Sequence, residues 1–273
     1  MTESGWERFE ASLYSTTSLL VFAEGESLVV DPAISKDEVA AIALRAQELG
    51  APVRTVLITH GDWDHVCGIA GFPAATAVMS EETGEKVASG AAGEAVQWAA
   101  AEYDIVPAGA PRIDQTFRRG STVSLGPFLV ETFPLAGHTA DGSGFRLREQ
   151  GLLIVGDYLS ADEFPFGTSP AAYRATLIGL IETLRADPPD VVIRGHGPPS
   201  GVADALAIAE ADLAYLRSLH TAVGAALSGG GTSDEARAAG LAVDLPRAAP
   251  PDLEEMRGFN VEREIEEILA AGT

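Results

Sequence analysis

The stretch ITHGDWDHVCG, residues 58–68, places two histidines and two aspartates within the six residues 60–65. The whole chain has only five histidines, so this clustering needs an explanation. The residues just before it, Thr-Val-Leu-Ile at 55–58, form an apolar run typical of a short buried strand. Two interpretations follow: a polar loop that ends a strand, or one part of a metal site. The presence or absence of further candidate metal ligands elsewhere in the chain decides between the two interpretations.

Composition limits the possible functions. A chain of 273 residues can bury a sizeable core, as one large domain or as a domain with an appendage. The formal net charge is −22, and Lys36 and Lys86 are the only lysines. Such a field repels polyanions, which disfavours nucleic acid or an anionic membrane as the partner and leaves a small-molecule substrate. Solubility alone accounts for the acidity equally well.

The compartment is predicted from cysteine usage and from the amino terminus. The single cysteine, Cys67, excludes an internal disulfide and any multi-cysteine zinc cluster. A small buried residue is a better interpretation of Cys67 than a ligand or a nucleophile. Residues 1–10 are acidic and lack the apolar core of a signal peptide, and no apolar run reaches the length of a membrane span. The sequence therefore predicts a cytoplasmic protein.

Strand and helix signals alternate along the chain. Ser35 and Glu38 form a capping box that predicts a helix ending at Gly50, and Ser169 with Pro170 predicts another helix start. The alanine-rich region 80–103 is also predicted helical. Strands are expected at 18–22, 27–30, 55–58, 123–125, 128–133, 152–155 and 191–193. After a helix from about residue 202, the glycines at 229–231 and Pro250-Pro251 suggest a flexible connection, and Pro251 and Asp252 start a final helix toward residue 270.

Polar clusters follow four of these apolar strands directly. They contain His60 with its neighbours, His138, Asp157 and His196. In layered α/β proteins the residues just beyond strand ends collect at one rim of the sheet, so we expect these four positions to converge. The fifth histidine, His220, lies on an amphipathic helical stripe and is predicted to be a partly buried helix residue.

The converging residues have the chemistry of a site for two divalent ions. Such a site needs nitrogen and oxygen ligands from several directions and a bridging carboxylate. One ligand set can be His60, Asp62 and His138, and the other Asp64, His65 and His196, with Asp157 bridging.

These motifs in this order resemble those of the metallo-β-lactamase-fold hydrolase superfamily. The matching elements are the opening hairpin ending in Asp31, the HxDxDH run at 60–65, GHTADGS from Gly137, GD at Asp157 and GHG at His196, and they extend from about residue 15 to 200. The resemblance implies an α/β fold, a four-layer αββα sandwich over 1–205, with a helical extension at 206–273 packed on it. It also implies that Asp31 supports the site without binding metal; a simple turn before Pro32 is the alternative.

Asp62 departs from the commonest form of the motif, because many members carry a histidine there. Two divalent ions bring four positive charges, and Asp62, Asp64, Asp157 and a bridging hydroxide would bring four negative ones. A neutral centre should attract anionic substrates less than a histidine-rich one. The extra oxygen ligand makes manganese or iron more competitive, although zinc remains the expected metal.

The function expected from this site is metal-dependent hydrolysis of a small ester, thioester, lactone or amide by a metal-bridging hydroxide that Asp64 orients. The loop at 158–166 carries Asp162 and Glu163 and no cation, which favours a neutral or weakly charged substrate. Candidate substrate contacts are Trp63, Tyr158, Phe164, Phe166 and Asn260. Two alternatives remain: a phosphoric-ester hydrolase or nuclease, for which Arg118-Arg119 and Arg194 could receive the anion, and a metal-bearing binding or regulatory module with little turnover.

Overall fold

The computed structural model describes residues 4–248 and 253–271. The chain forms two compact units built from interleaved segments. The first, here called the sheet unit, comprises Met1–Pro134, Asp141–Gly156 and Ile193–Pro199. The second, here called the helical unit, comprises Leu135–Ala140, Asp157–Val192 and Ser200–Thr273. The division expected near residue 205 stays a prediction, and helix α6 (Val202–Ser228) runs through that point.

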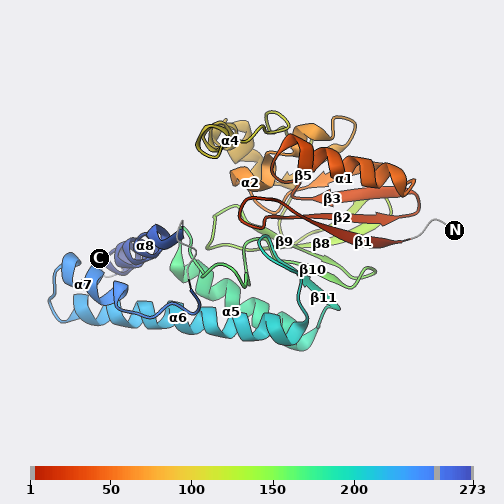
Figure 1. The fold of residues 1–273 in the computed structure, drawn as a ribbon. Coiled ribbons are helices and arrows are strands. Elements are labelled where there is room, and N and C mark those ends of the chain that lie inside the picture. Colours follow the sequence, from red (N-terminus) through yellow and green to blue (C-terminus); the bar gives the residue numbers. More distant parts are fainter. Residues whose placement is uncertain (1–3, 249–252, 272–273) are drawn as a thin grey trace. The chain divides into compact units, whose positions relative to one another are not determined.

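The sheet unit begins with a six-stranded mixed sheet in the order β1-β2-β3-β4-β5-β6 (Figure 1). Its strands are β1 (Gly5–Glu10), β2 (Thr17–Ala23), β3 (Glu26–Val30), β4 (Val53–Leu57), β5 (Thr76–Ser80) and β6 (Gln115–Phe117). The first three strands pair antiparallel, as the predicted hairpin requires, and β3 to β6 pair parallel. Every residue of β2 is buried, so both faces of the sheet are covered and the strand is apolar without alternation.

The described part of the sheet unit, from residue 4 onward, contains the α-helices α1 (Lys36–Glu48), α2 (Trp63–Val66), α3 (Glu81–Ala88) and α4 (Ala91–Glu102), with a 3₁₀ turn at Ile69–Gly71. Helix α1 starts with the predicted capping box and lies along the six-stranded sheet (Figure 1). Its buried residues Val39 and Ile42 share one hydrophobic core with Val29 and Val56 of the sheet. The region predicted helical at 80–103 is two helices, because Gly90 has a φ of 90° and starts α4 anew.

A second, five-stranded sheet has the order β11-β10-β9-β8-β7. Its strands are β7 (Thr122–Leu125), β8 (Phe128–Pro134), β9 (Ser143–Leu147), β10 (Leu152–Ile154) and β11 (Val191–Ile193). The predicted hairpin of β7 and β8 turns at Gly126, whose φ is 58°. Within the sheet unit the two sheets meet, for example where the rings of Phe117 and Phe145 lie 5.9 Å apart. The strands therefore form a sandwich whose loops carry the polar motifs.

The helical unit contains α5 (Pro170–Ala186), α6, α7 (Ser233–Leu241) and α8 (Glu254–Ala271). Ser169 caps α5, as predicted. Helix α7 was not expected, and it begins with a capping box between Thr232 and Glu235 just after the glycine run. The predictions for Pro250, Pro251 and Asp252 lie outside the described residues. Among residues 4–248 and 253–271, no helix combines the length and hydropathy needed to cross a bilayer.

The capping box of α1 gives a pH-dependent prediction. Burial alone would raise the pKa of Glu38, but the backbone N–H groups of Ser35 and Ser12 donate to its carboxylate and lower the pKa from 4.5 to about 2. A lowered folded-state pKa stabilises the fold above about pH 4.5, and the stabilisation is lost as the pH falls toward 2. We expect Glu38→Gln to lower the free energy of unfolding by about 1 kcal/mol at pH 7, after allowing for solvent screening.

Urea unfolding at several pH values between 7 and 3 checks this. The difference in the free energy of unfolding between the wild type and Glu38→Gln should become smaller as the pH falls. Glu85→Gln on the exposed side of α3 is the matched control, with an expected change below about 0.5 kcal/mol. A Glu38→Gln difference that stayed constant over this range would contradict the assigned cause.

Candidate metal centre

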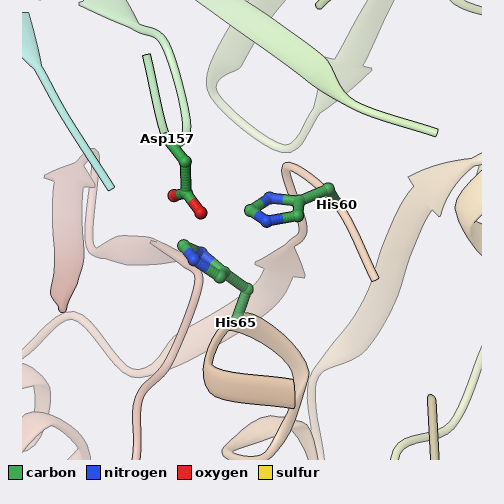
Figure 2. A group of neighbouring side chains, drawn as sticks. All are labelled: His60, His65 and Asp157. Atoms are coloured by element: carbon green, nitrogen blue, oxygen red, sulfur yellow. The ribbon is translucent and has the colours of Figure 1, made fainter. Parts of the chain in front are cut away.

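The loop after β4 and the short helix α2 present the first histidines of the site. Asp62 is the residue before α2, and this one-turn helix brings His65 back toward His60. Figure 2 shows the two imidazole rings close to each other. Their centroids lie 4.1 Å apart, and both residues are buried. A run that looks linear in the sequence is therefore folded into a compact cluster.

Asp64 joins His65 to a histidine that follows the last strand of the sandwich. Its Oδ2 lies 3.4 Å from Nε2 of His65 and 3.5 Å from Nε2 of His196. One ligand atom from each of these three buried residues lies within 4.8 Å of the others. His196 is brought there because the segment after β11 pairs with Thr16 in an isolated β-bridge. Residues that are far apart in the sequence thus meet within the sheet unit.

Hydrogen bonds at the other ring nitrogen orient both histidines. Nδ1 of His65 lies 3.0 Å from Oδ2 of Asp31, and Nδ1 of His196 lies 2.9 Å from the carbonyl of Tyr14. Since both partners are acceptors, each neutral ring carries its proton on Nδ1 and presents the Nε2 lone pair. Two lone pairs then face the same Asp64 carboxylate, an arrangement that a cation between them stabilises. The donor chemistry therefore fits a divalent metal ion.

Asp31 is held firmly in this network. Its carboxylate accepts hydrogen bonds from the backbone N–H of Thr59 at 2.8 Å and from the Thr59 hydroxyl at 2.6 Å. Its backbone has a φ of 47°, a left-handed conformation that aspartate tolerates better than most residues. Asp31 thus connects the end of β3 to His65 and to the loop that carries His60.

Asp62 has a partner that sequence reasoning did not consider. Its Oδ2 lies 3.6 Å from Nε2 of His60, and Nζ of Lys86 donates to its Oδ1 at 2.6 Å. Burial alone would lower the pKa of Lys86, but the carboxylates of Asp62, Asp141 and Asp64 raise it above its ordinary value. Lys86 is therefore a charged ammonium beside the site.

Asp141 is a second residue that the sequence did not single out, although it lies in the quoted GHTADGS segment. Its Oδ2 accepts a 2.7 Å hydrogen bond from the backbone N–H of Gly61. Burial alone would raise the pKa of Asp141, but His60 and Lys86 lower it. Asp141 thereby anchors the loop between His60 and Asp62. Its place in the same segment, three residues after the predicted ligand His138, was the available signal.

The helical unit positions His138 and Asp157 relative to each other. Nε2 of His138 lies 3.1 Å from Oδ2 of Asp157. Nδ1 of His138 lies 2.9 Å from the carbonyl of Phe166, so this histidine also directs Nε2 toward a carboxylate. The Phe166 ring contacts the imidazole edge-on with centroids 5.2 Å apart.

The predicted substrate contacts occupy different environments. Tyr158 and Phe164 are buried, and the Tyr158 hydroxyl donates to the carbonyl of Ala136. Phe166 is partly exposed, as is Trp63, which stacks on Tyr103 at 5.5 Å between centroids. Substrate contact by any of them stays a prediction.

The loop at 158–166 has a cationic neighbour from a distant part of the sequence, which the sequence could not reveal. Arg247 donates to the backbone carbonyl of Glu163 and to the carboxylate of Asp212. Its charge is therefore paired within the helical unit. Arg119 is likewise bound, to Glu82 and to the carbonyl of Gly142.

His220 and Cys67 are placed outside the ligand groups. Nδ1 of His220 lies 2.6 Å from the buried carboxylate of Glu264, a partner that the sequence pattern did not reveal. Cys67 is fully buried, and burial raises the pKa of its thiol. A buried thiol of raised pKa is a poor nucleophile, which agrees with the packing role expected for it.

Asn260, the only asparagine of the chain, ties α8 to the loop that supports His138. Its Nδ2 donates to the carbonyl of Pro165 at 2.7 Å, and its Oδ1 accepts from the N–H of Gly167 at 3.1 Å. We expect Asn260→Ala to lower the free energy of unfolding by about 2 kcal/mol or more, because two buried backbone groups lose their partner. Urea unfolding measures this effect.

Gly258→Ala on the same helix is its control. A Cβ at Gly258 would meet no atom within 4 Å, so this change should be neutral or stabilising by about 0.5–1 kcal/mol. An Asn260→Ala protein as stable as the wild type would show that the two bonds do not stabilise the native state.

Comparison with known proteins agrees with this geometry. The sequence profile described as "Metallo-beta-lactamase superfamily" matches residues 12–196. A curated relative, a hydroxyacylglutathione hydrolase of Cereibacter sphaeroides, is 31% identical over 139 residues, which cover 51% of this chain and 45% of that protein. The chain thus spans less than half the length of this relative.

Solved structures show the same fold. The metallo-beta-lactamase family protein TTHA1429 from Thermus thermophilus has a TM-score of 0.69 at 20% identity and covers 98% of this chain and 94% of its own. TTHA1623, solved in a di-iron-bound form, has a TM-score of 0.57 at 21% identity. The match covers 72% of this chain and 95% of TTHA1623. These likenesses confirm the expected αββα class with additional C-terminal helices. The profile match over most of the chain places this protein in the metallo-beta-lactamase superfamily.

Proposed function

We propose that this protein is a metal-dependent hydrolase of a small acyl compound, and that a thioester is the first substrate class to test. The observation that carries the proposal is the buried group of Asp64, His65 and His196, whose ligand atoms lie within 4.8 Å of one another. The oriented Nε2 atoms of the two histidines support metal binding at this group. Esters, lactones and amides remain within the proposed substrate range.

The thioester preference is supported by the matched relatives, which are named hydroxyacylglutathione hydrolases. Hydrolysis of a hydroxyacyl-glutathione cleaves a thioester, so the relatives' name points to this bond type. Because the match covers less than half of each relative, the leaving group and the acyl group of this protein's substrate are part of the proposal. A small-molecule substrate, with no nucleic acid, is a further prediction from the acidic composition. Residence in the cytoplasm also stays a prediction.

The proposed ligand roles follow the family motif. His60, Asp62 and His138 would hold one divalent ion, Asp64, His65 and His196 the other, with Asp157 shared. Zinc is the expected metal, and manganese or iron are the alternatives. Such ions supply Lewis acidity and an activated water when bound. Asp64 would receive and hold the proton that this water loses, and Asp31 would keep His65 in the tautomer that binds metal.

One experiment tests the proposal. The purified protein is analysed for bound metal, stripped with a chelator and reloaded separately with zinc, manganese and iron. Each form is assayed with chromogenic thioesters, esters, lactones, β-lactams and phosphodiesters. We expect bound transition metal, loss of activity on stripping, and recovery with highest kcat/KM on a thioester or ester.

The alternatives predict other results from the same panel. Activity confined to phosphodiesters would identify a phosphoric-ester hydrolase, and bound metal without turnover on any substrate would favour a binding or regulatory module. A preparation that holds no transition metal and binds none on reloading would overturn the proposed function altogether.

A further inference from the structure

We propose that Lys86 is a positioning residue of the metal centre, and that the Asp62–Lys86 pair takes the place of the histidine that many superfamily members carry at position 62. This inference rests on the proposed function, because it assigns a role to Lys86 only if Asp62 binds metal. It concerns residues of the sheet unit alone.

The two oxygens of Asp62 have different neighbours. Oδ1 accepts the 2.6 Å hydrogen bond from Nζ of Lys86, and Oδ2 lies on the side of His60, 3.6 Å from its Nε2. The side chain of Lys86 is 31% exposed, so more than two thirds of its surface is covered. A pair this enclosed is screened less than an exposed ion pair, whose contribution is usually small. Lys86 can therefore fix the carboxylate so that one oxygen is directed toward a metal ion.

The loop is shaped to let this lysine reach its partner. A Cβ at Gly61 would lie 2.8 Å from Cδ of Lys86 and 3.1 Å from Oδ2 of Asp141. The alkyl chain of Lys86 thus passes over Gly61, which lies between His60 and Asp62 and has no side chain. Asp141 holds this same position through the N–H of Gly61. Beside His60, Gly61 therefore packs against Lys86 and hydrogen-bonds to Asp141, and Lys86 hydrogen-bonds to Asp62.

Charge gives the physical reason for the pair. Relative to a neutral histidine, Asp62 subtracts one charge from the site, and Lys86 adds one. The pair is therefore equivalent in net charge to the imidazole that it replaces. The expectation of a neutral centre counted Asp62 but not Lys86, and with Lys86 included the site keeps the net charge of the histidine-rich form.

A lysine suits this role better than an arginine would. The chain has only two lysines and otherwise uses arginine for positive charge. An ammonium is a compact charge that can bond one carboxylate oxygen, whereas a guanidinium tends to engage both oxygens side by side. A bidentate arginine would place a donor on both oxygens of Asp62, including the one on the side of His60, and would compete there with a metal ion.

A double-mutant experiment tests the inference without measuring activity. Zinc affinity and stoichiometry are measured by chelator competition and elemental analysis for the wild type, Lys86→Gln, Asp62→His and the double variant. We expect Asp62→His alone to weaken zinc binding at least about tenfold, because an ammonium without its carboxylate lies beside a divalent ion. Adding Lys86→Gln should restore the affinity to within about threefold of wild type. Lys86→Gln alone should weaken zinc binding about threefold, because Asp62 loses the hydrogen bond that directs its carboxylate, and this loss outweighs the removal of the opposing ammonium.

Lys36→Gln, at the exposed start of α1, is the matched control and should change zinc affinity in neither background. If Asp62→His is too unstable to measure, Asp62→Asn makes the same change in charge with less change in shape, and the same rescue by Lys86→Gln is expected.

The results separate this inference from the function on which it rests. If Lys86→Gln changes zinc affinity equally in the wild type and in the Asp62→His protein, Lys86 does not act through Asp62. The wild type would still bind metal in that case, so the proposed function would stand. A wild-type protein that binds no metal would overturn both.

Discussion

Asp64→Asn lowers kcat by about 10²–10⁴-fold, with the fold intact, if Asp64 orients and deprotonates the attacking water. The Asp64 carboxylate lies within 3.5 Å of Nε2 of both His65 and His196, and the Thr16 hydroxyl donates to it at 3.3 Å. An asparagine of the same shape keeps the packing but cannot take a proton and is a weaker metal ligand. Steady-state kinetics on the best substrate of the panel, with metal content measured in parallel, gives the result.

The control is Asp104→Asn, because Asp104 is exposed and has a φ of 51°, a conformation that asparagine adopts equally well. His138→Ala, which removes another proposed ligand, should lower turnover to a similar extent. Unchanged activity in both Asp64→Asn and His138→Ala would refute the assigned centre.

Gly68→Ala is expected to have the largest effect on stability, about 3 kcal/mol or more, for a reason that begins in the motif at 58–68. A Cβ at Gly68 would lie 2.0 Å from the carbonyl oxygen of Pro32 and 2.8 Å from a methyl of Val39. The backbone oxygen cannot move away as the end of a side chain could, because Asp31 and Pro32 are both buried. Relief of the overlap must shift the backbone, which costs more than ordinary overpacking.

Urea unfolding of Gly68→Ala is compared with Gly93→Ala on α4, where a Cβ would meet no atom within 4 Å and where alanine favours the helix. We expect the second variant to be as stable as the wild type or more stable. The same shift should separate Asp31 from His65, so Gly68→Ala protein that still folds should bind zinc less tightly. A Gly68→Ala protein of wild-type stability would mean that the close approach to Pro32 is not maintained in solution.

Asp64 and Gly68 belong to one short segment, residues 58–68. Asp64 contributes chemistry, and Gly68 allows the segment to approach the end of β3, where Asp31 is the partner of His65. The motif at 58–68 therefore carries its candidate ligands together with the glycine that lets them dock against β3.

Local sequence predicted the elements whose cause is local. The capping box of Ser35 and Glu38, the proline after Ser169 and the turn at Gly126 each fix a backbone conformation within a few residues, and the structure has them. The strands that were not predicted, β1, β5, β6 and β9, lack such a signature. Strand β1 reads GWERFE and is only partly buried, and β9 contains Gly144 and Arg146, so neither has the apolar run or alternation that predicts a strand.

The family and the residue types of the candidate site could be predicted from the sequence alone, because histidines and aspartates that follow strand ends in this order suit few kinds of site besides a metal centre. The partners of these residues became visible only in the folded chain, where Lys86 binds Asp62, Asp141 binds Gly61, and Glu264 binds His220. Each pair joins residues from different elements. The reason is physical, since a hydrogen bond or an ion pair depends on distance in space, and the sequence specifies that distance only through the packing of the whole fold.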